Sequence, residues 1–165
     1  MSRGNEILRP CPGCGALVPE IDGPTHPYIG ASPGCWAIYG EVLAKEYAYP
    51  PVHRLTVDAY AAQHPGVPGR RSIQSVAVHL ISLYLILERG YEPERATAAI
   101  REALESRSEN FVWLDPPASL GGITVLDVRE AEDLAEHTER VEECAGSVWE
   151  AWKPHQDTVR RWAGR

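Results

Sequence analysis

The stretch CPGCG at residues 11–15 is followed by a third cysteine in SPGCW at residues 32–36, with twenty residues between the second cysteine and the third. Two cysteines separated by proline and glycine form a tight turn that points both sulfurs into one hollow, which is half of a tetrahedral zinc site. The Ser-Pro pair before the third cysteine is typical of a helix start, and a helix N-terminus favours the thiolate form of a cysteine in its first turn. We therefore predict a Zn²⁺ site that uses Cys11, Cys14 and Cys35.

A four-coordinate zinc ion needs one more ligand, and we predict that it is His26. This residue lies in the segment THPY at residues 25–28, between the second and third cysteines, where its ring can swing inward. Cys144, a solvent molecule or another histidine are the alternatives. A thioredoxin-like redox pair is the rival interpretation of Cys-Pro-Gly-Cys. That motif requires a preceding strand within a βαβ unit, and the ten residues before Cys11 do not provide one.

Residues 1–34 are predicted to form an irregular lobe, because six prolines interleaved with glycines leave room only for short strands around residues 16–18. Such a segment buries little apolar surface by itself, so we expect the metal to hold it in place. Residues 35–165 are predicted to form a helical body, and the whole chain, 1–165, a single domain. The predicted helices cover residues 34–47, 52–64, 72–89, 93–106 and 128–152, with a last turn or two after Pro154.

The expected fold class is therefore mainly α: a helical bundle of five or six helices with an irregular, zinc-pinned N-terminal lobe. The run Ser72 to Arg89 has almost no polar face, so we expect it to be buried on all sides at the centre of the body. Residues 107–123 lack periodicity, and a short β-hairpin or an ordered loop is expected over residues 111–126. Trp149, Trp152 and Trp162 are expected to pack in the core.

The acidic composition argues against two classes of partner. The net charge is −7, so the chain lacks the basic face that nucleic acid or an anionic membrane surface would need, and we expect neither as a partner. Met1 to Arg9 has no apolar core of signal-peptide length, and the longest nearly apolar run, Val76 to Leu87, is too short to span a bilayer. We expect a cytoplasmic, reducing location, where cysteines are more often metal ligands or reactive groups than disulfides.

Four histidines are expected on buried helical faces: His53, His64, His79 and His155. His79 lies within an apolar run, where a buried imidazole needs a partner for each ring nitrogen. It is either a core histidine satisfied by a carboxylate or carbonyl group, or part of a metal site that uses three of these histidines with Asp58 or Glu88. In the second case an open coordination position would activate water. The candidate catalytic residues are then His64, His79, Asp58 and His155.

Cys144 is predicted to be a bystander of the zinc site. It lies between Val141 and Val148, in step with the inward stripe of the helix predicted over residues 128–152. A free cysteine at such a position acts as a small apolar residue. Nothing in the pattern brings this helix to the N-terminal lobe, so we expect the zinc site to form without Cys144.

Five segments carry a resemblance to a known family: CPGCG (11–15), THPY (25–28), SPGCW (32–36), VDAYAAQHPG (57–66) and SVAVHL (75–80). Together they resemble an uncharacterised bacterial family of small proteins that carries a domain-of-unknown-function label, and the resemblance runs over most of the chain. It implies no established activity. The segment at residues 57–66 has more polar side chains than a packing helix needs, which favours a polar site near His64 and His79.

Three functions are consistent with these residues. The leading hypothesis is a small cytoplasmic zinc-binding protein whose metal is structural and whose biochemical activity is unknown. The first alternative is an enzyme, a metal-dependent hydrolase with a histidine-based site in the helical core. The second alternative is a protein-interaction module, which would display an exposed aromatic patch and no pocket for a small molecule.

Overall fold

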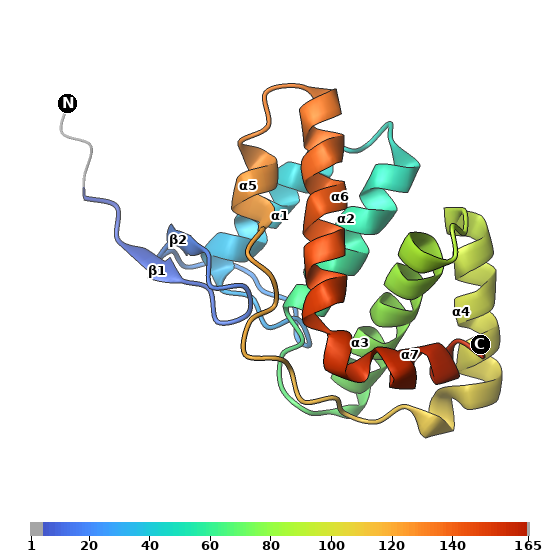
Figure 1. Cartoon of the computed structure of the whole chain (residues 1–165). Coiled ribbons are helices and arrows are strands. Elements are labelled where there is room, and N and C mark those ends of the chain that lie inside the picture. Colours follow the sequence, from blue (N-terminus) through green and yellow to red (C-terminus); the bar gives the residue numbers. More distant parts are fainter. Residues whose placement is uncertain (1–4, 165) are drawn as a thin grey trace.

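A computed structural model describes residues 5–164 and confirms the mainly α fold class (Figure 1). Within these residues the chain forms seven α-helices and one two-stranded sheet, one helix more than the upper end of the prediction. None of the helices there is long and apolar enough to cross a membrane. The strands are β1 (Leu8–Pro10) and β2 (Leu17–Pro19), and the helices are α1 (Pro33–Ala44), α2 (Pro50–Gln63), α3 (Arg70–Leu83), α4 (Pro93–Arg107), α5 (Val125–Arg129), α6 (Leu134–Ala151) and α7 (Gln156–Trp162).

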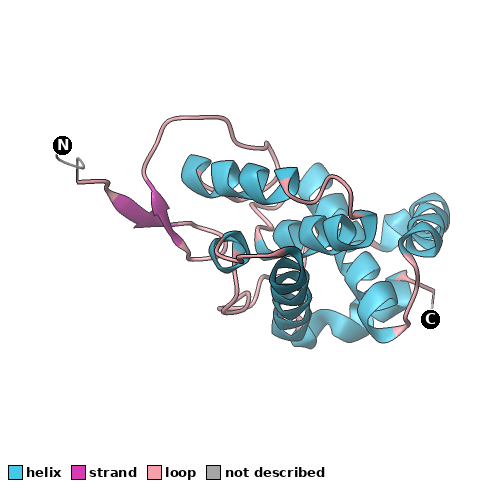
Figure 2. Cartoon of the chain, turned by 90° about the horizontal axis from the view of Figure 1, so that it is seen from above, coloured by secondary structure: helices cyan, strands magenta, loops and turns pink. Residues whose placement is uncertain are grey.

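The two strands form a hairpin at the end of the molecule that lies away from the C-terminus (Figure 2). They pair antiparallel, with Leu8 opposite Pro19 and Pro10 opposite Leu17. Leu8 and Leu17 are exposed, whereas Val18 is buried. The hairpin therefore buries little apolar surface of its own, as predicted for this segment.

Helix α1 begins where the Ser-Pro pair predicts. Ser32 is the N-cap, and its side chain accepts a hydrogen bond from the backbone N–H of Cys35 at 3.4 Å. The start of the helix lies directly against β2: a Cβ on Gly34 would sit 2.2 Å from the carbonyl oxygen of Pro19, so only glycine fits there. This close approach holds Cys35 beside the N-terminal hairpin.

The larger of two apolar clusters joins α2, α3, α4, α6 and α7. Leu80 and Trp152 are among its largest fully buried side chains, and burial of such a side chain contributes about 1.5–3 kcal/mol. The indole N–H of Trp152 donates to the carbonyl oxygen of Ala62 at 3.0 Å, so burial leaves its polar atom satisfied. Trp149 and Trp162 belong to the same cluster, which confirms the predicted core role of the three tryptophans.

The smaller apolar cluster attaches the N-terminal lobe to the body. It includes Val18 from β2, Ile38 and Val42 from α1, Val125 from α5 and Val141 from α6. This cluster therefore packs the hairpin together with α1, α5 and α6.

The helix predicted over residues 72–89 forms as α3 followed by a π-helical segment, η1 (Tyr84–Glu88). The expectation that it is buried on all sides is wrong. Leu80 is fully buried, but Gln74 is exposed and His79 is half-buried. The exposed side of α3 borders two surface cavities, and an apolar pattern cannot indicate where packing leaves such spaces.

The helix predicted over residues 128–152 is wrong at its start, because two helices form there. Thr124 opens α5 with a capping box: its backbone N–H donates to Oδ2 of Asp127 at 2.8 Å, and its side chain accepts in return. Asp133 caps α6 by accepting from the backbone N–H of Glu136 at 2.8 Å. Apolar residues continue at helical spacing between α5 and α6. The capping bonds, and not the apolar pattern, therefore determine where the two helices begin. Residues 111–124 form the ordered loop rather than the hairpin.

Candidate metal centre

Four side chains with metal-binding atoms meet beside the N-terminal hairpin. The Sγ atoms of the three predicted cysteines and one ring nitrogen of His64 all lie within 4.8 Å of one another. Cys11 and Cys14 belong to the turn that joins β1 to β2, Cys35 lies in the first turn of α1, and His64 directly follows α2. This is the one such group found in the part of the chain that the structure describes. It joins the lobe to the body.

The turn that carries Cys11 and Cys14 is held by its own backbone. The N–H of Gly15 donates to the carbonyl oxygen of Cys11 at 2.9 Å, and Gly15 has a φ of 75°, which favours glycine. Gly13 allows the turn to approach the histidine, because a Cβ there would lie 2.4 Å from Cδ2 of His64. The CPGCG sequence thus positions two thiols and packs the turn against the fourth group.

A hydrogen bond on the far side of its ring orients His64. Its Nδ1 lies 2.7 Å from the carbonyl oxygen of Tyr60, and since a carbonyl oxygen only accepts, Nδ1 carries a proton. In the neutral ring Nε2 then presents a lone pair toward Cys35, whose Sγ lies 3.5 Å away. The residue is 0% exposed. A metal-binding histidine is oriented in the same way, by a group that fixes its other nitrogen.

Tyr60 also contacts the thiols. Its hydroxyl oxygen lies 3.3 Å from Sγ of Cys35, and burial together with the nearby Cys35 holds the pKa of Tyr60 above its ordinary value. The hydroxyl therefore keeps its proton and is able to donate it to the sulfur.

The thiols and the imidazole shift one another's protonation. Hydrogen bonds from Cys14 and Cys35 lower the pKa of Cys11. Burial lowers the pKa of His64, but hydrogen bonds to Cys11 and Cys14 outweigh it and raise that pKa to about 9. The metal-free site thus favours a thiolate paired with an imidazolium. A metal ion would take the place of the imidazolium proton, because cysteine binds metals as the thiolate.

One sulfur–sulfur distance and one sulfur–nitrogen distance within the group fit a tetrahedral ion. Cys14 Sγ and Cys35 Sγ are 3.9 Å apart, well beyond a disulfide bond of about 2.0 Å. Zn–S bonds of about 2.3 Å and a Zn–N bond of about 2.0 Å give tetrahedral edges of about 3.8 Å between sulfurs and about 3.5 Å between sulfur and nitrogen. The sulfur–nitrogen edge from Cys35 to His64 is 3.5 Å.

His26, the ligand predicted from the sequence, lies outside this group. Its Nδ1 accepts a hydrogen bond from the backbone N–H of Tyr28 at 3.4 Å, and its ring packs edge-on against the Tyr28 ring. Cys144 also lies outside the group. Its thiol donates to the carbonyl oxygen of Ile123 at 3.3 Å, and burial raises its pKa to about 12.

Two glycines bring the loop before α1 to the end of α2. The N–H of Gly30 donates to the carbonyl oxygen of His64 at 3.0 Å, and a Cβ on Gly30 would lie 2.8 Å from Cα of Gly66. Such a contact between distant segments cannot be read from residue spacing. The sequence contained one signal for His64: it lies at a helix end, directly before Pro65 and Gly66. There a side chain need not follow the apolar face of the helix.

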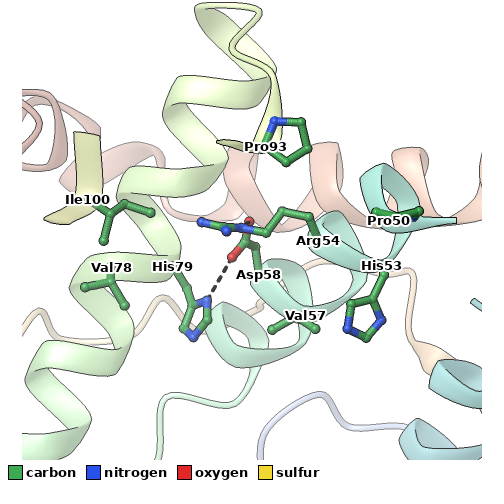
Figure 3. A pocket seen from close by; sticks show the side chains of 9 residues that line it. All are labelled: Pro50, His53, Arg54, Val57, Asp58, Val78, His79, Pro93 and Ile100. Atoms are coloured by element: carbon green, nitrogen blue, oxygen red, sulfur yellow. Dashed lines mark hydrogen bonds and ion pairs between the residues drawn. The ribbon is translucent and has the colours of Figure 1, made fainter. Parts of the chain in front are cut away.

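The candidate residues Asp58 and His79 do pair, but His64 is not part of their cluster. Nδ1 of His79 lies 2.9 Å from Oδ1 of Asp58 (Figure 3). The other carboxylate oxygen accepts hydrogen bonds from the hydroxyl of Ser82 and from Nε of Arg54, the latter at 3.2 Å. Asp58 is buried, whereas 24% of the His79 side chain is exposed. His64 instead uses its ring nitrogens on Tyr60 and the cysteines, so the joint site expected for His64 and His79 does not form.

Sequence reasoning missed a buried carboxylate that follows α1. Glu46 is 1% exposed, and its Oε2 accepts hydrogen bonds from Nε2 of His137, at 2.8 Å, and from the hydroxyl of Thr56. Its Oε1 has no hydrogen-bond partner among the described residues, and Nδ1 of His53 lies 3.5 Å from it. His53 is exposed, contrary to its predicted burial. Because Glu46 and His137 are far apart in the chain, no local pattern indicates this pair.

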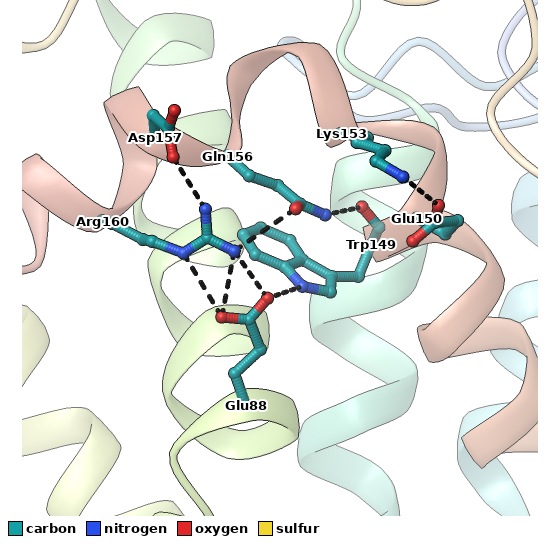
Figure 4. Close-up of polar contacts among 7 residues, drawn as sticks. All are labelled: Glu88, Trp149, Glu150, Lys153, Gln156, Asp157 and Arg160. Atoms are coloured by element: carbon teal, nitrogen blue, oxygen red, sulfur yellow. Dashed lines mark hydrogen bonds and ion pairs between the residues drawn. The ribbon is translucent and has the colours of Figure 1, made fainter.

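The last two candidates from the sequence serve the C-terminal part of the fold. His155 donates from Nε2 to the carbonyl oxygen of Asp115 at 2.8 Å. Glu88, at the end of η1, accepts from the indole N–H of Trp149 at 3.0 Å and from the guanidinium of Arg160 at 2.9 Å (Figure 4). These contacts hold a loop and α7 on the body, and neither residue belongs to the cluster of metal-binding groups.

Comparison with known proteins agrees with the resemblance found in the sequence. A family model described as a family of unknown function (DUF5946) matches residues 9–153. The matched region includes all four residues of the candidate metal centre as well as Asp58 and His79. No curated protein matches the chain, and no solved structure matches it either.

Proposed function

The chain belongs to the family of unknown function DUF5946, and from the geometry of its cysteine and histidine cluster we propose that it binds one Zn²⁺ ion as a structural metal. Cys11, Cys14 and Cys35 would bind through thiolate sulfur, and His64 would bind through Nε2. The observation that carries this proposal is that the Cys14–Cys35 sulfur–sulfur distance, 3.9 Å, and the Cys35–His64 sulfur–nitrogen distance, 3.5 Å, agree with the edges of a zinc tetrahedron.

The donor set favours zinc over other common ions. Three thiolates and one imidazole are soft or borderline ligands, which suit zinc and disfavour the oxygen-seeking Mg²⁺ and Ca²⁺. Four protein ligands complete a tetrahedron, so no position remains open for water or a substrate. Cys35 and His64 are both 0% exposed, which further separates the ion from solvent. A closed and buried site supports a structural role rather than a catalytic one.

The fold supplies a reason for the metal. Val18 is buried, but four other large apolar side chains in and beside the hairpin are 46–60% exposed: Ile7, Leu8, Leu17 and Ile21. Hydrophobic burial therefore contributes little to the stability of the lobe. Metal binding can replace that contribution, because the binding free energy of a structural zinc ion becomes folding free energy. The ion would bind the hairpin turn, the start of α1 and the end of α2 together.

Metal analysis of the full chain, purified without added metal, tests the proposal. We expect about one zinc ion per chain, and we expect a strong chelator to lower the thermal midpoint and expose the three thiols to a thiol reagent. A metal-free protein whose thermal midpoint does not respond to chelators would rule the proposal out. A second tightly bound ion would instead favour the enzyme hypothesis.

We also propose that the protein works in the reducing cytoplasm, since zinc-binding thiolates must remain reduced. The four cysteines are free thiols, which supports this setting. The net charge of −7 supports the proposal that nucleic acids and anionic membranes are not its partners.

A further inference from the structure

A second polar site lies on α2 and α3, around the Asp58–His79 pair. Two cavities of about 450 and 540 Å³ border it, and both are lined by Val78 and His79. They therefore adjoin along one face of α3. Each lies in the range of small-molecule sites, which are typically about 300–1,000 Å³.

The larger cavity is basic. Its lining includes Arg70, Arg71 and Gln74, and it contains no carboxylate among the described residues. Neither arginine forms an ion pair within residues 5–164. On a chain with a net charge of −7, two unpaired arginines in one cavity form a local positive field that attracts an anion.

Helix α3 begins at this cavity. Its N-cap, Gly69, has no side chain to accept a hydrogen bond from the first turn, so the free backbone N–H groups of that turn add to the positive field. Two guanidinium groups and a helix N-terminus together suit a phosphate, which offers several oxygens and up to two negative charges.

The smaller cavity is mostly apolar. Pro50, Val57, Val78, Pro93 and Ile100 form much of its lining (Figure 3). Arg54 and His53 also line it, but Nε of Arg54 already donates to Asp58 and its Nη1 donates to Thr97 at 2.7 Å. This cavity therefore suits the apolar part of a ligand.

Asp58 fixes the orientation of His79 at the junction. Because the carboxylate accepts from Nδ1, the other ring nitrogen, Nε2, is left without a protein partner within the described residues. The carboxylate is 1% exposed and also accepts from Ser82 and Arg54. Burying a carboxylate and three hydrogen-bond donors costs free energy unless all of these polar groups are satisfied. A hydrophobic core can pack without such a network. The network holds one imidazole where the two cavities meet.

We propose that these adjoining cavities bind a small organic phosphate ester. Its phosphate lies beside Arg70, Arg71 and the first turn of α3, its apolar group fills the cavity between α2, α3 and α4, and Nε2 of His79 bonds an oxygen between the two. The site uses none of the four metal-binding residues, so its test is independent of the zinc proposal.

Phenyl phosphate is a suitable probe, titrated into the full chain and followed by calorimetry and by backbone amide NMR shifts. We expect saturable binding, with the largest shifts at Arg71, Val78 and Ile100. Inorganic phosphate and phenol should each bind at least roughly tenfold more weakly than phenyl phosphate. Each of them makes the contacts of only one of the two cavities. No binding at millimolar phenyl phosphate, or shifts that cluster elsewhere, would overturn the proposal.

Variants separate the proposed site from general attraction of anions. The double change Arg70→Ala and Arg71→Ala should weaken phenyl phosphate binding roughly tenfold or more, since charge-assisted hydrogen bonds are lost. Arg89→Ala combined with Arg161→Ala removes the same charge outside the cavities and should leave binding unchanged. Equal weakening by both double variants would refute the site.

Two further variants test its other parts. His79→Asn keeps an N–H donor for Asp58 but removes Nε2, so it should weaken binding while the thermal midpoint stays near that of the wild type. Ile100→Trp fills the apolar cavity and should abolish the preference for phenyl phosphate over inorganic phosphate. Retention of that preference in the Ile100 variant would contradict the proposed orientation of the ligand.

Discussion

Replacing His64 with alanine should release the proposed zinc ion, whereas replacing His26 should not. His64 is 0% exposed and its Nε2 lies 3.5 Å from Cys35 Sγ, while His26 is partly exposed and bonds to the backbone of Tyr28. The His64→Ala variant keeps three thiolates but loses the group that closes the tetrahedron. Water can take the fourth position only if it reaches a site that the protein otherwise seals.

The size of the effect follows from linkage. Loss of a single outer-shell partner typically weakens metal binding 10–100-fold, so loss of a direct ligand is expected to weaken it roughly a thousandfold. At saturating free zinc, a thousandfold increase in the dissociation constant removes about 4 kcal/mol from the free energy of unfolding. The cavity left by the imidazole adds a further cost, but that cost is present with and without zinc.

The assay is therefore urea unfolding of wild type, His64→Ala and His26→Ala, each in a zinc buffer and in a chelator, with zinc content measured in parallel. The zinc-dependent part of the stability should fall by about 4 kcal/mol in His64→Ala. The same quantity should stay within about 0.5 kcal/mol of wild type in His26→Ala, as for a surface substitution. His155→Ala serves as a matched histidine control, because its ring bonds to Asp115 and not to the cluster.

The reasoning fails if His64→Ala retains a full zinc ion and an unchanged zinc-dependent stability. It also fails if His26→Ala is the variant that loses the metal, since the sequence-based ligand assignment would then be correct. Loss of zinc in both variants would show that His64 is not the sole fourth ligand.

Three further predictions concern residues in and beside the metal centre. Cys35→Ala should release the metal and unfold the N-terminal lobe. Cys144→Ala should keep the full metal content and lower the free energy of unfolding by about 1 kcal/mol or less, because Cys144 only donates to Ile123. Metal analysis and urea unfolding compare the two variants. Tyr60→Phe removes the hydroxyl that lies 3.3 Å from Cys35 Sγ. Zinc affinity, measured by competition with a chelating dye, should therefore fall by roughly 10-fold. An unchanged affinity would show that the hydroxyl does not support the thiolate. Gly13→Ala would place a Cβ 2.4 Å from the His64 ring, so it should lower the free energy of unfolding by about 1–3 kcal/mol and weaken zinc binding. A thermal midpoint equal to that of the wild type would mean that the turn and the ring are farther apart than described.

Much of the helical fold could be predicted because its signals act over a few residues. Ser32 and Pro33 indicate the start of α1, and Pro93 indicates the start of α4, both within one residue of their positions in the structure. Such signals depend on backbone groups within the same turn, so they hold whatever the surrounding fold.

The sequence reasoning failed where two local signals competed. Apolar residues continue at helical spacing across residues 128–134, which favoured one long helix. The side chain of Asp133 caps a new helix instead, and Thr124 opens α5 earlier than predicted. The capping bonds stabilise both helix starts because they satisfy backbone N–H groups there. A pattern of apolar residues alone does not indicate this stabilisation.

The sequence by itself determined the helical class and three of the four groups of the candidate metal centre, because Cys11 and Cys14 share one turn and Cys35 lies at a helix start that its own neighbours specify. Only the tertiary structure decided the fourth group. His64 reaches the thiols because α2 ends where Gly30 and Gly66 let two backbones touch, which depends on how the lobe and the body pack. The pairing of Asp58 with His79 depends in the same way on the packing of α2 against α3. Packing sums many weak contacts between distant segments, so no short stretch of sequence contains it.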